Sequence, residues 1–171
     1  TKYINGHSDV VGGAVLARDP ALVEELTWWA NCLGLTGSPF DSYQTLRGLR
    51  TLNVRYRQHA ENAATIAAFL DGHPDAARVY YPGLVSHPGH ELARRQQDSF
   101  GAMISFELDA ADEEIPVFLR ELKLFTLAES LGGVESLLEH RASIEGPSTP
   151  VPRDLLRLSA GIESAEELLA D

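Results

Sequence analysis

Cysteine, positive charge and long apolar runs are all scarce in this chain of 171 residues. Cys32 is the only cysteine, so the chain cannot form an intramolecular disulfide or a cysteine-based zinc site. Because Cys32 follows a helical apolar segment, we expect it to be buried and unreactive. No apolar run reaches the roughly 18 residues that a membrane-spanning helix needs, so we expect no membrane partner.

Positive charge is outweighed by negative charge. Lysine and arginine total 14, aspartate and glutamate total 25, and the formal net charge is −11. A surface that binds nucleic acid needs clustered positive charge to meet the phosphates, so we expect no nucleic-acid partner. The composition is otherwise that of an ordinary globular protein. These properties are typical of an acidic cytoplasmic enzyme that acts on small molecules.

The first residues contain the most reactive combination of side chains. Lys2 follows Thr1, and an apolar run over 10–18 begins shortly afterwards. A lysine amine held in a shielded pocket can lose its proton and attack a carbonyl group, and a neighbouring hydroxyl can donate to a phosphate. Taken alone, this pattern is more typical of a solvated surface lysine.

The periodicity of apolar residues predicts interleaved strands and helices. The run over 10–18 reads as a strand buried on both faces, and Asp19-Pro20 predicts the start of a helix that ends near Gly34. Further helices are expected at 40–46, 52–70, 91–97, 112–122 and from 163 onward, and strands at 78–81, 102–108, 124–127 and 155–159. Because the strands do not follow a strict βαβ cadence, the C-terminal part is expected to be an α+β layer.

Several longer blocks resemble one known family, and they occur in the family's order. The blocks are TKYINGHSDVVGG (1–13), FDSYQTLRGLRTL (40–52), YPGLVSHPGHELARRQ (81–96), FGAMISFEL (100–108), LAESLGGVESL (127–137) and LLRLSAGIE (155–163). They resemble the enzymes of cysteine and methionine metabolism that depend on pyridoxal 5'-phosphate (PLP). This trans-sulfuration family includes cystathionine gamma-synthase, cystathionine gamma- and beta-lyase, methionine gamma-lyase and the homoserine sulfhydrylases.

The resemblance implies an α/β protein with the fold of type I PLP-dependent transferases. Residues 1–55 would be the end of the large PLP-binding domain, and residues 56–171 the small C-terminal α+β domain. The family implies PLP as cofactor, small amino acids as substrates and a homotetramer as the assembly. Because family members place a long PLP-binding half before the lysine, we expect this chain to be the C-terminal part of a longer enzyme.

The same resemblance implies roles for five residues. Lys2 would form the Schiff base with PLP and carry protons, and Thr1 would contact the cofactor phosphate. Arg157 would grip the α-carboxylate of the substrate through a bidentate pair; a solubility role on an edge strand is the alternative. Glu129 would meet the distal amino group of a cystathionine-like substrate and Ser130 would orient Lys2 or the carboxylate, unless the two are a solvated glutamate and a turn serine.

Glu129 favours cystathionine chemistry, because methionine gamma-lyases usually carry an apolar residue there. The resemblance therefore implies a cystathionine gamma-synthase, which joins an O-acylated homoserine to cysteine. Cystathionine gamma-lyase activity and a gamma-synthase of specialised metabolism are alternatives, since the stretch 140–152 is shorter and richer in proline than in many relatives. A non-catalytic C-terminal fragment is a further alternative.

Other candidate clusters are expected to be structural. His7, Ser8 and Asp9 are adjacent in sequence, so their side chains cannot converge as a catalytic triad. His87 and His90 lack the partner ligands of a metal site. Arg47 and Arg50 resemble structural family residues, with a contact to the cofactor phosphate or a neighbouring subunit as the alternative. The adjacent Trp28 and Trp29 cannot both face one small core, which predicts packing onto further protein.

Overall fold

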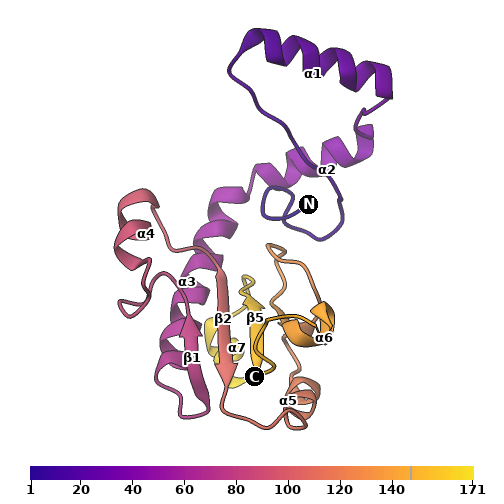
Figure 1. The fold of residues 1–171 in the computed structure, drawn as a ribbon. Helices are drawn as coiled ribbons and strands as arrows, with labels where there is room; N and C mark the ends of the chain where they lie inside the picture. Colours follow the sequence, from indigo (N-terminus) through magenta and orange to yellow (C-terminus); the bar gives the residue numbers. More distant parts are fainter. Residues whose placement is uncertain (147) are drawn as a thin grey trace.

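A computed structural model of the chain describes residues 1–146 and 148–171. An irregular N-terminal segment leads into three helices, and a mixed sheet with further helices follows (Figure 1). The helices are α1 (Pro20–Leu33), α2 (Pro39–Leu49), α3 (Leu52–Asp71), α4 (His90–Gln96), α5 (Ile115–Glu121), α6 (Arg141–Glu145) and α7 (Ala165–Ala170). The strands are β1 (Ala76–Tyr80), β2 (Met103–Leu108), β3 (Thr126–Leu127), β4 (Leu137–His140) and β5 (Leu155–Ser159).

The five strands form one sheet in the order β1-β2-β5-β4-β3. All neighbouring pairs are antiparallel except β3 and β4, which are parallel. The helix α3 contacts β1, β2 and α7. The core lies between the sheet and these helices and includes Ala63, Ile66, Ile104, Phe106, Ile115, Leu138, Leu156, Leu158 and Leu168. This architecture confirms the expected α/β fold.

Alternation along the strands gives the sheet two chemically different faces. Leu156 and Leu158 of β5 are in the core, so Arg157 and Ser159 point to the opposite face. Ser105 of β2 and Glu139 of β4 both lie in register with Arg157. The face turned away from the apolar core therefore carries a row of polar side chains across three strands.

The ends of α1 and α2 follow from short capping sequences. The side chain of Asp19 accepts a hydrogen bond from the Ala21 N–H at 2.9 Å, and Pro20 starts the helix. Gly34 ends α1 in the left-handed conformation, with φ of 68°, which glycine adopts at little cost. Ser38 caps α2 in the same way as Asp19 caps α1, accepting from the Asp41 N–H at 3.3 Å.

The main error of the sequence analysis is the strand expected at 10–18. The structure has no strand there, and Val11, Val15 and Leu16 are between 80% and 90% exposed. No neighbouring strand of the described chain lies against this run, so its apolar character alone does not produce a strand. Cys32 was expected to be buried but is exposed. It lies in α1, which has no buried residue.

Smaller differences concern the ends of two expected elements and the presence of two further elements that were not expected. The strand expected at 124–127 is reduced to Thr126–Leu127, and the helix expected at 112–122 spans only Ile115–Glu121. The strand β4 and the helix α6 were missed. No helix of residues 1–146 and 148–171 is long and apolar enough to cross a membrane.

Candidate active site

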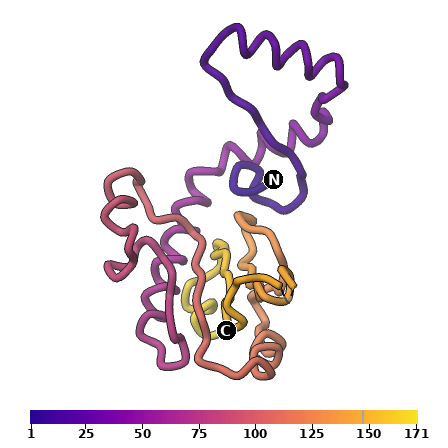
Figure 2. The backbone as a smooth tube through the Cα atoms, in the orientation of Figure 1, coloured from indigo at the N-terminus to yellow at the C-terminus, as the bar shows by residue number. Residues whose placement is uncertain are grey.

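A buried arginine fixes the loop that carries Lys2. Arg55 of α3 is 5% exposed, and its Nη1 donates to the Tyr3 carbonyl oxygen at 3.0 Å. Its Nη2 donates to the Gly48 carbonyl oxygen at 2.7 Å and to that of Ile4 at 3.5 Å. Three carbonyl groups of two separate segments thus share one guanidinium, which stabilises the loop beside the junction of α2 and α3 (Figure 2).

Two glycines allow the loop to approach the helices this closely. A Cβ atom at Gly48 would overlap the backbone of Asn5, and one at Gly6 would overlap the guanidinium of Arg55. Gly6 also has a φ of 75°, where a larger side chain is strained. The position of Lys2 therefore depends on contacts with residues more than 40 positions away.

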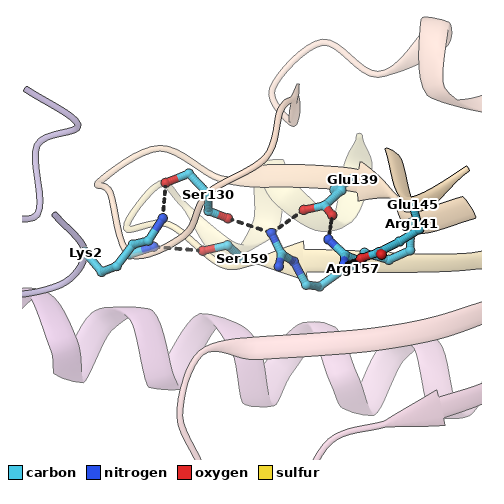
Figure 3. Close-up of polar contacts among 8 residues, drawn as sticks. Lys2, Ser130, Glu139, Arg141, Glu145, Arg157 and Ser159 are labelled. Atoms are coloured by element: carbon cyan, nitrogen blue, oxygen red, sulfur yellow. Dashed lines mark hydrogen bonds and ion pairs between the residues drawn. The ribbon is translucent and has the colours of Figure 1, made fainter. Parts of the chain in front are cut away.

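The Lys2 amine reaches a second loop. Its Nζ donates to the Ser130 Oγ at 2.8 Å (Figure 3). Ser130 has a φ of 96°, a conformation uncommon for a residue with a side chain. Two residues later the Gly132 N–H donates to the buried Ser159 Oγ at 3.1 Å. These contacts tie the 130–132 loop to β5 and hold the Ser130 hydroxyl opposite Lys2.

Ser130 also contacts Arg157, so one residue links two of the predicted site residues. The Arg157 Nη2 donates to the Ser130 carbonyl oxygen at 3.1 Å. Its Nε is buried and has no hydrogen-bond acceptor among the residues that the structure describes. Lys2, Ser130 and Arg157 thus lie together (Figure 3), and Arg157 retains a donor that a ligand could satisfy.

Glu139 is a site residue that the sequence analysis missed. Its side chain is only 1% exposed and forms ion pairs with Arg157 and with Arg141. Arg141 also pairs with Glu145 four residues along the chain. The hydrogen bond from Arg141 to Glu139 raises the pKa of Arg141. The signal that could have found Glu139 is a glutamate inside an apolar strand, which must have a cationic partner if it is buried.

Thr1 and Glu129 are not brought to this cluster by direct contacts. The Thr1 Oγ1 donates to the Gly12 carbonyl oxygen and accepts from the Gly12 N–H, both at 2.8 Å. Glu129 is exposed and lines a pocket of about 430 Å³ together with Arg120, Glu139 and others. Glu129 therefore lies near the buried carboxylate of Glu139 and does not hydrogen-bond to the amine of Lys2, whose partner is Ser130.

Tyr3, next to Lys2 in the loop, packs its half-buried ring against α3. The Tyr3 ring lies edge-on to those of Tyr56 and His59, with centroids 5.5 and 5.4 Å away. Burial raises the pKa of Tyr3 to about 12. Burial also lowers the pKa of His59, whose Nδ1 lies 2.7 Å from the Ala160 carbonyl oxygen. Both groups are therefore neutral at pH 7 and act as packing elements.

The adjacent His7, Ser8 and Asp9 do not hydrogen-bond to one another. His7 contacts the Asn5 carbonyl oxygen, Ser8 donates to Glu135, and Asp9 accepts from the Asn5 amide at 2.7 Å. The expectation of structural hydrogen bonds is confirmed. Across the described ranges, no group of three or more His, Cys, Asp or Glu side chains could hold a metal ion.

The site thus combines an exposed lysine amine, a serine beside it and an arginine on the polar face of the sheet. An amine in this position can attack a carbonyl group, and a guanidinium can bind a carboxylate. The sequence profile of the Cys/Met metabolism PLP-dependent enzymes matches residues 1–171. The chain belongs to this family.

The relatives that the chain matches are named for different reactions. Cystathionine gamma-synthase of Escherichia coli strain K12 is 51% identical over 179 residues, covering 100% of this chain and 46% of the relative. Cystathionine beta-lyase of Coxiella burnetii is 47% identical over 180 residues, with 100% and 46% covered. The structure of cystathionine gamma synthase from Xanthomonas oryzae pv. oryzae, in complex with aminoacrylate and cysteine, is 60% identical, with a TM-score of 0.94 over 99% of this chain and 46% of that one.

The chain thus spans about half the length of the relatives that it matches, and its residues fit part of a PLP site. The exposed amine of Lys2 fits a covalent anchor for the cofactor. The Nε of Arg157, which has no acceptor among the described residues, fits a donor to a substrate carboxylate. The hydroxyl of Thr1 is bonded to Gly12 and would have to exchange that partner to bind a phosphate. The family and its cofactor are confirmed. The roles of single residues and the domain boundary at residue 55 remain predictions.

Proposed function

We propose that the protein containing this chain is a cystathionine gamma-synthase, which replaces the acyl group of an O-acylated homoserine with the sulfur of cysteine. The observation that carries the proposal is the contact of Ser130 with both Lys2 and Arg157. A reaction at the γ-carbon needs a proton carrier beside the amino-acid backbone and a group that fixes its α-carboxylate. The identity of 51% to a cystathionine gamma-synthase supports this reaction class.

Three residues of the cluster have defined tasks in the proposed mechanism. Arg157 holds the α-carboxylate with its guanidinium, which fixes how the substrate is presented. Lys2 would hold PLP, and its free amine would move a proton between carbons of the bound substrate. The Ser130 hydroxyl accepts from the Lys2 amine and keeps it directed at the substrate. Bound PLP supplies the electron sink that makes these C–H bonds acidic.

Glu129 is proposed to meet the distal amino group of a cystathionine-sized ligand. It is exposed and lines the pocket next to Glu139, so its charge is available to a cationic group at short range. Thr1 is proposed to contact the cofactor phosphate after releasing Gly12. The same residues would serve cystathionine cleavage, which keeps cystathionine gamma-lyase as the second candidate.

Two assays with the full-length, PLP-loaded protein separate these reactions. In the first, an O-acylhomoserine and cysteine are supplied and cystathionine is measured by mass spectrometry. In the second, cystathionine is supplied and release of cysteine and a 2-oxoacid is followed. We expect the first rate to exceed the second by at least about tenfold, which is about 1.4 kcal/mol in transition-state free energy. Faster cleavage would support the lyase, and a loaded protein with neither activity would contradict both candidates.

We also propose a cytoplasmic homotetramer, as the family resemblance implies. Trp28 and Trp29 are 57% and 47% exposed, and α1 as a whole has no buried residue. Exposed apolar surface of this extent is typical of protein contact sites. Sedimentation of the full-length protein at assay concentration tests the assembly, and an active monomer would contradict it.

A further inference from the structure

The four charged residues Arg157, Glu139, Arg141 and Glu145 form a chain of alternating sign across β5, β4 and α6 (Figure 3). Glu139 stands at its centre and is the most buried, at 1% exposed, whereas Arg157 and Arg141 are 26% and 25% exposed. Each carboxylate oxygen of Glu139 has its own guanidinium, since Oε1 contacts Arg141 and Oε2 contacts Arg157. The central carboxylate is therefore shared by two arginines.

Burial makes the carboxylate of Glu139 a strong competitor for a cation. A buried carboxylate is stable only when it is paired with positive charge. If Arg157 were its only partner, the two charges would cancel and the guanidinium could take a bidentate position on Glu139. A substrate carboxylate would then have to compete with Glu139 for the same donors.

The second guanidinium changes this balance. Arg141 occupies Oε1 and neutralises the charge of Glu139, so that Arg157 makes only one contact to the carboxylate, through Nη2. The position of Arg141 is itself fixed, because it is the first residue of α6 and pairs with Glu145 one turn later. Such pairs at i and i+4 lie on one face of a helix. Arg157 thereby keeps its positive charge and a buried Nε without an acceptor among the described residues.

We propose that Arg141 is a positioning residue that sets the affinity for the substrate's α-carboxylate, by holding Glu139 away from full pairing with Arg157. This inference rests on the proposed function, in which Arg157 binds that carboxylate. Arg141 itself touches neither substrate nor cofactor in this account. Its effect is expected in substrate binding rather than in the chemical steps.

The test uses the full-length, PLP-loaded protein and compares Arg141→Gln with the control Arg153→Gln. Arg153 is a more exposed arginine beyond α6 that pairs with Asp112 at 3.3 Å. For Arg141→Gln we expect KM for the O-acylhomoserine to rise ~tenfold while kcat changes less than about twofold. The Kd of L-norleucine, an amino acid without a leaving group, should rise in parallel. Arg153→Gln should change neither constant, and unchanged KM and Kd in Arg141→Gln would overturn the proposal.

Replacing Glu139 together with Arg141 tests the proposal more sharply than replacing Arg141 alone. In the double variant Glu139→Gln/Arg141→Gln both the competing negative charge and its second partner are gone, so KM should return to within about threefold of the parent value. A merely structural role predicts that the second substitution adds damage, and a double variant worse than Arg141→Gln would overturn the proposal. Arg141→Lys keeps the charge and should stay within about threefold of the parent; a loss as large as that of Arg141→Gln would also contradict it.

The variant Arg157→Lys separates a wrong role for Arg141 from a wrong proposed function. If Arg157→Lys raises KM but Arg141→Gln does not, Arg157 binds the carboxylate and only the role of Arg141 is wrong. If Arg157→Lys leaves KM and the Kd of L-norleucine unchanged, the carboxylate role of Arg157 fails and both conclusions fail with it.

Discussion

The segment with residues 10–49 and the sheet region that follows α3 are both rich in apolar residues, but they differ in packing. In the sheet region Ile104, Leu156 and Leu158 are at most 3% exposed. In the first segment α1 has no buried residue and extends away from the sheet (Figure 1). Among the described residues, an apolar run is therefore buried only where another segment packs against it.

The loop 1–9 is held by α3 and by the 130–132 loop, although it directly precedes the exposed segment in sequence. Arg55 binds its carbonyl groups, and Lys2 contacts Ser130. The proposed catalytic amine is thus positioned by residues distant in sequence.

Replacement of Lys2 should have the largest effect on activity and little on folding. For Lys2→Ala in the full-length protein we expect turnover to fall by about 10⁴-fold, since both the covalent anchor and the proton carrier are lost. Lys123→Ala is a matched control, because Lys123 is the other lysine of the chain. Steady-state rates and circular dichroism measure the two effects. Turnover within tenfold of the parent for Lys2→Ala would contradict the assignment.

Replacement of Arg55 should break the link between the loop and the helices α2 and α3. Arg55→Met removes the donor shared by the carbonyl oxygens of Tyr3, Ile4 and Gly48, and we expect a loss of about 3 kcal/mol in the free energy of unfolding. Because Lys2 would lose its fixed position, kcat should fall as well. The exposed Arg57→Gln should change the free energy of unfolding by less than about 0.5 kcal/mol. Equal denaturant midpoints for the two variants would refute the role of Arg55 as a clamp.

Arg157→Lys should separate substrate binding from stability. Lysine keeps the charge but loses the planar fork, so we expect kcat/KM to fall by about 30-fold, or about 2 kcal/mol. The melting temperature should change little, since Arg157 lies on the polar face of the sheet. Unchanged kcat/KM for the amino-acid substrate would show that Arg157 does not grip the carboxylate.

His59 should give the smallest effect, seen as a pH dependence of stability. Its pKa is lowered by burial, so the unfolded chain binds the proton more readily than the folded one. Its contribution is complete above the unfolded pKa near 6.5 and is lost as the pH falls below that value, by up to about 1.4 kcal/mol per pH unit. Denaturant unfolding at pH 8.0 and 5.5 measures the loss. A loss of equal size in His59→Gln would assign the pH dependence to other groups.

The sequence predicted those parts of the fold that depend on local signals. The ends of α1 followed from Asp19-Pro20 and Gly34, and β5 was predicted at its observed bounds because leucines alternate with Arg157 and Ser159. The strand at 10–18 was wrong because strand formation needs a partner strand, which an apolar run does not supply. The strand β4 was missed because Glu139 reads as a surface residue until its cross-strand partner Arg157 is known.

The site was predicted through family resemblance rather than through spacing. Lys2, Ser130 and Arg157 are separated by more than 100 and by 27 positions, and no local rule brings them together. The structure adds Arg55, Glu139 and Arg141, whose roles come from backbone carbonyls and strand register. The contacts of Arg55 and Arg141 exist only in the folded chain, so residue types alone could not predict them.

Reduction of the full-length protein with borohydride tests whether Lys2 is the covalent anchor of PLP. Borohydride fixes the cofactor to the lysine that holds it, and peptide mass spectrometry locates the adduct. We expect a pyridoxyl group on the peptide that contains Lys2 and none on the peptide that contains Lys123. An adduct on Lys123, or on a lysine outside this chain, would contradict the claim.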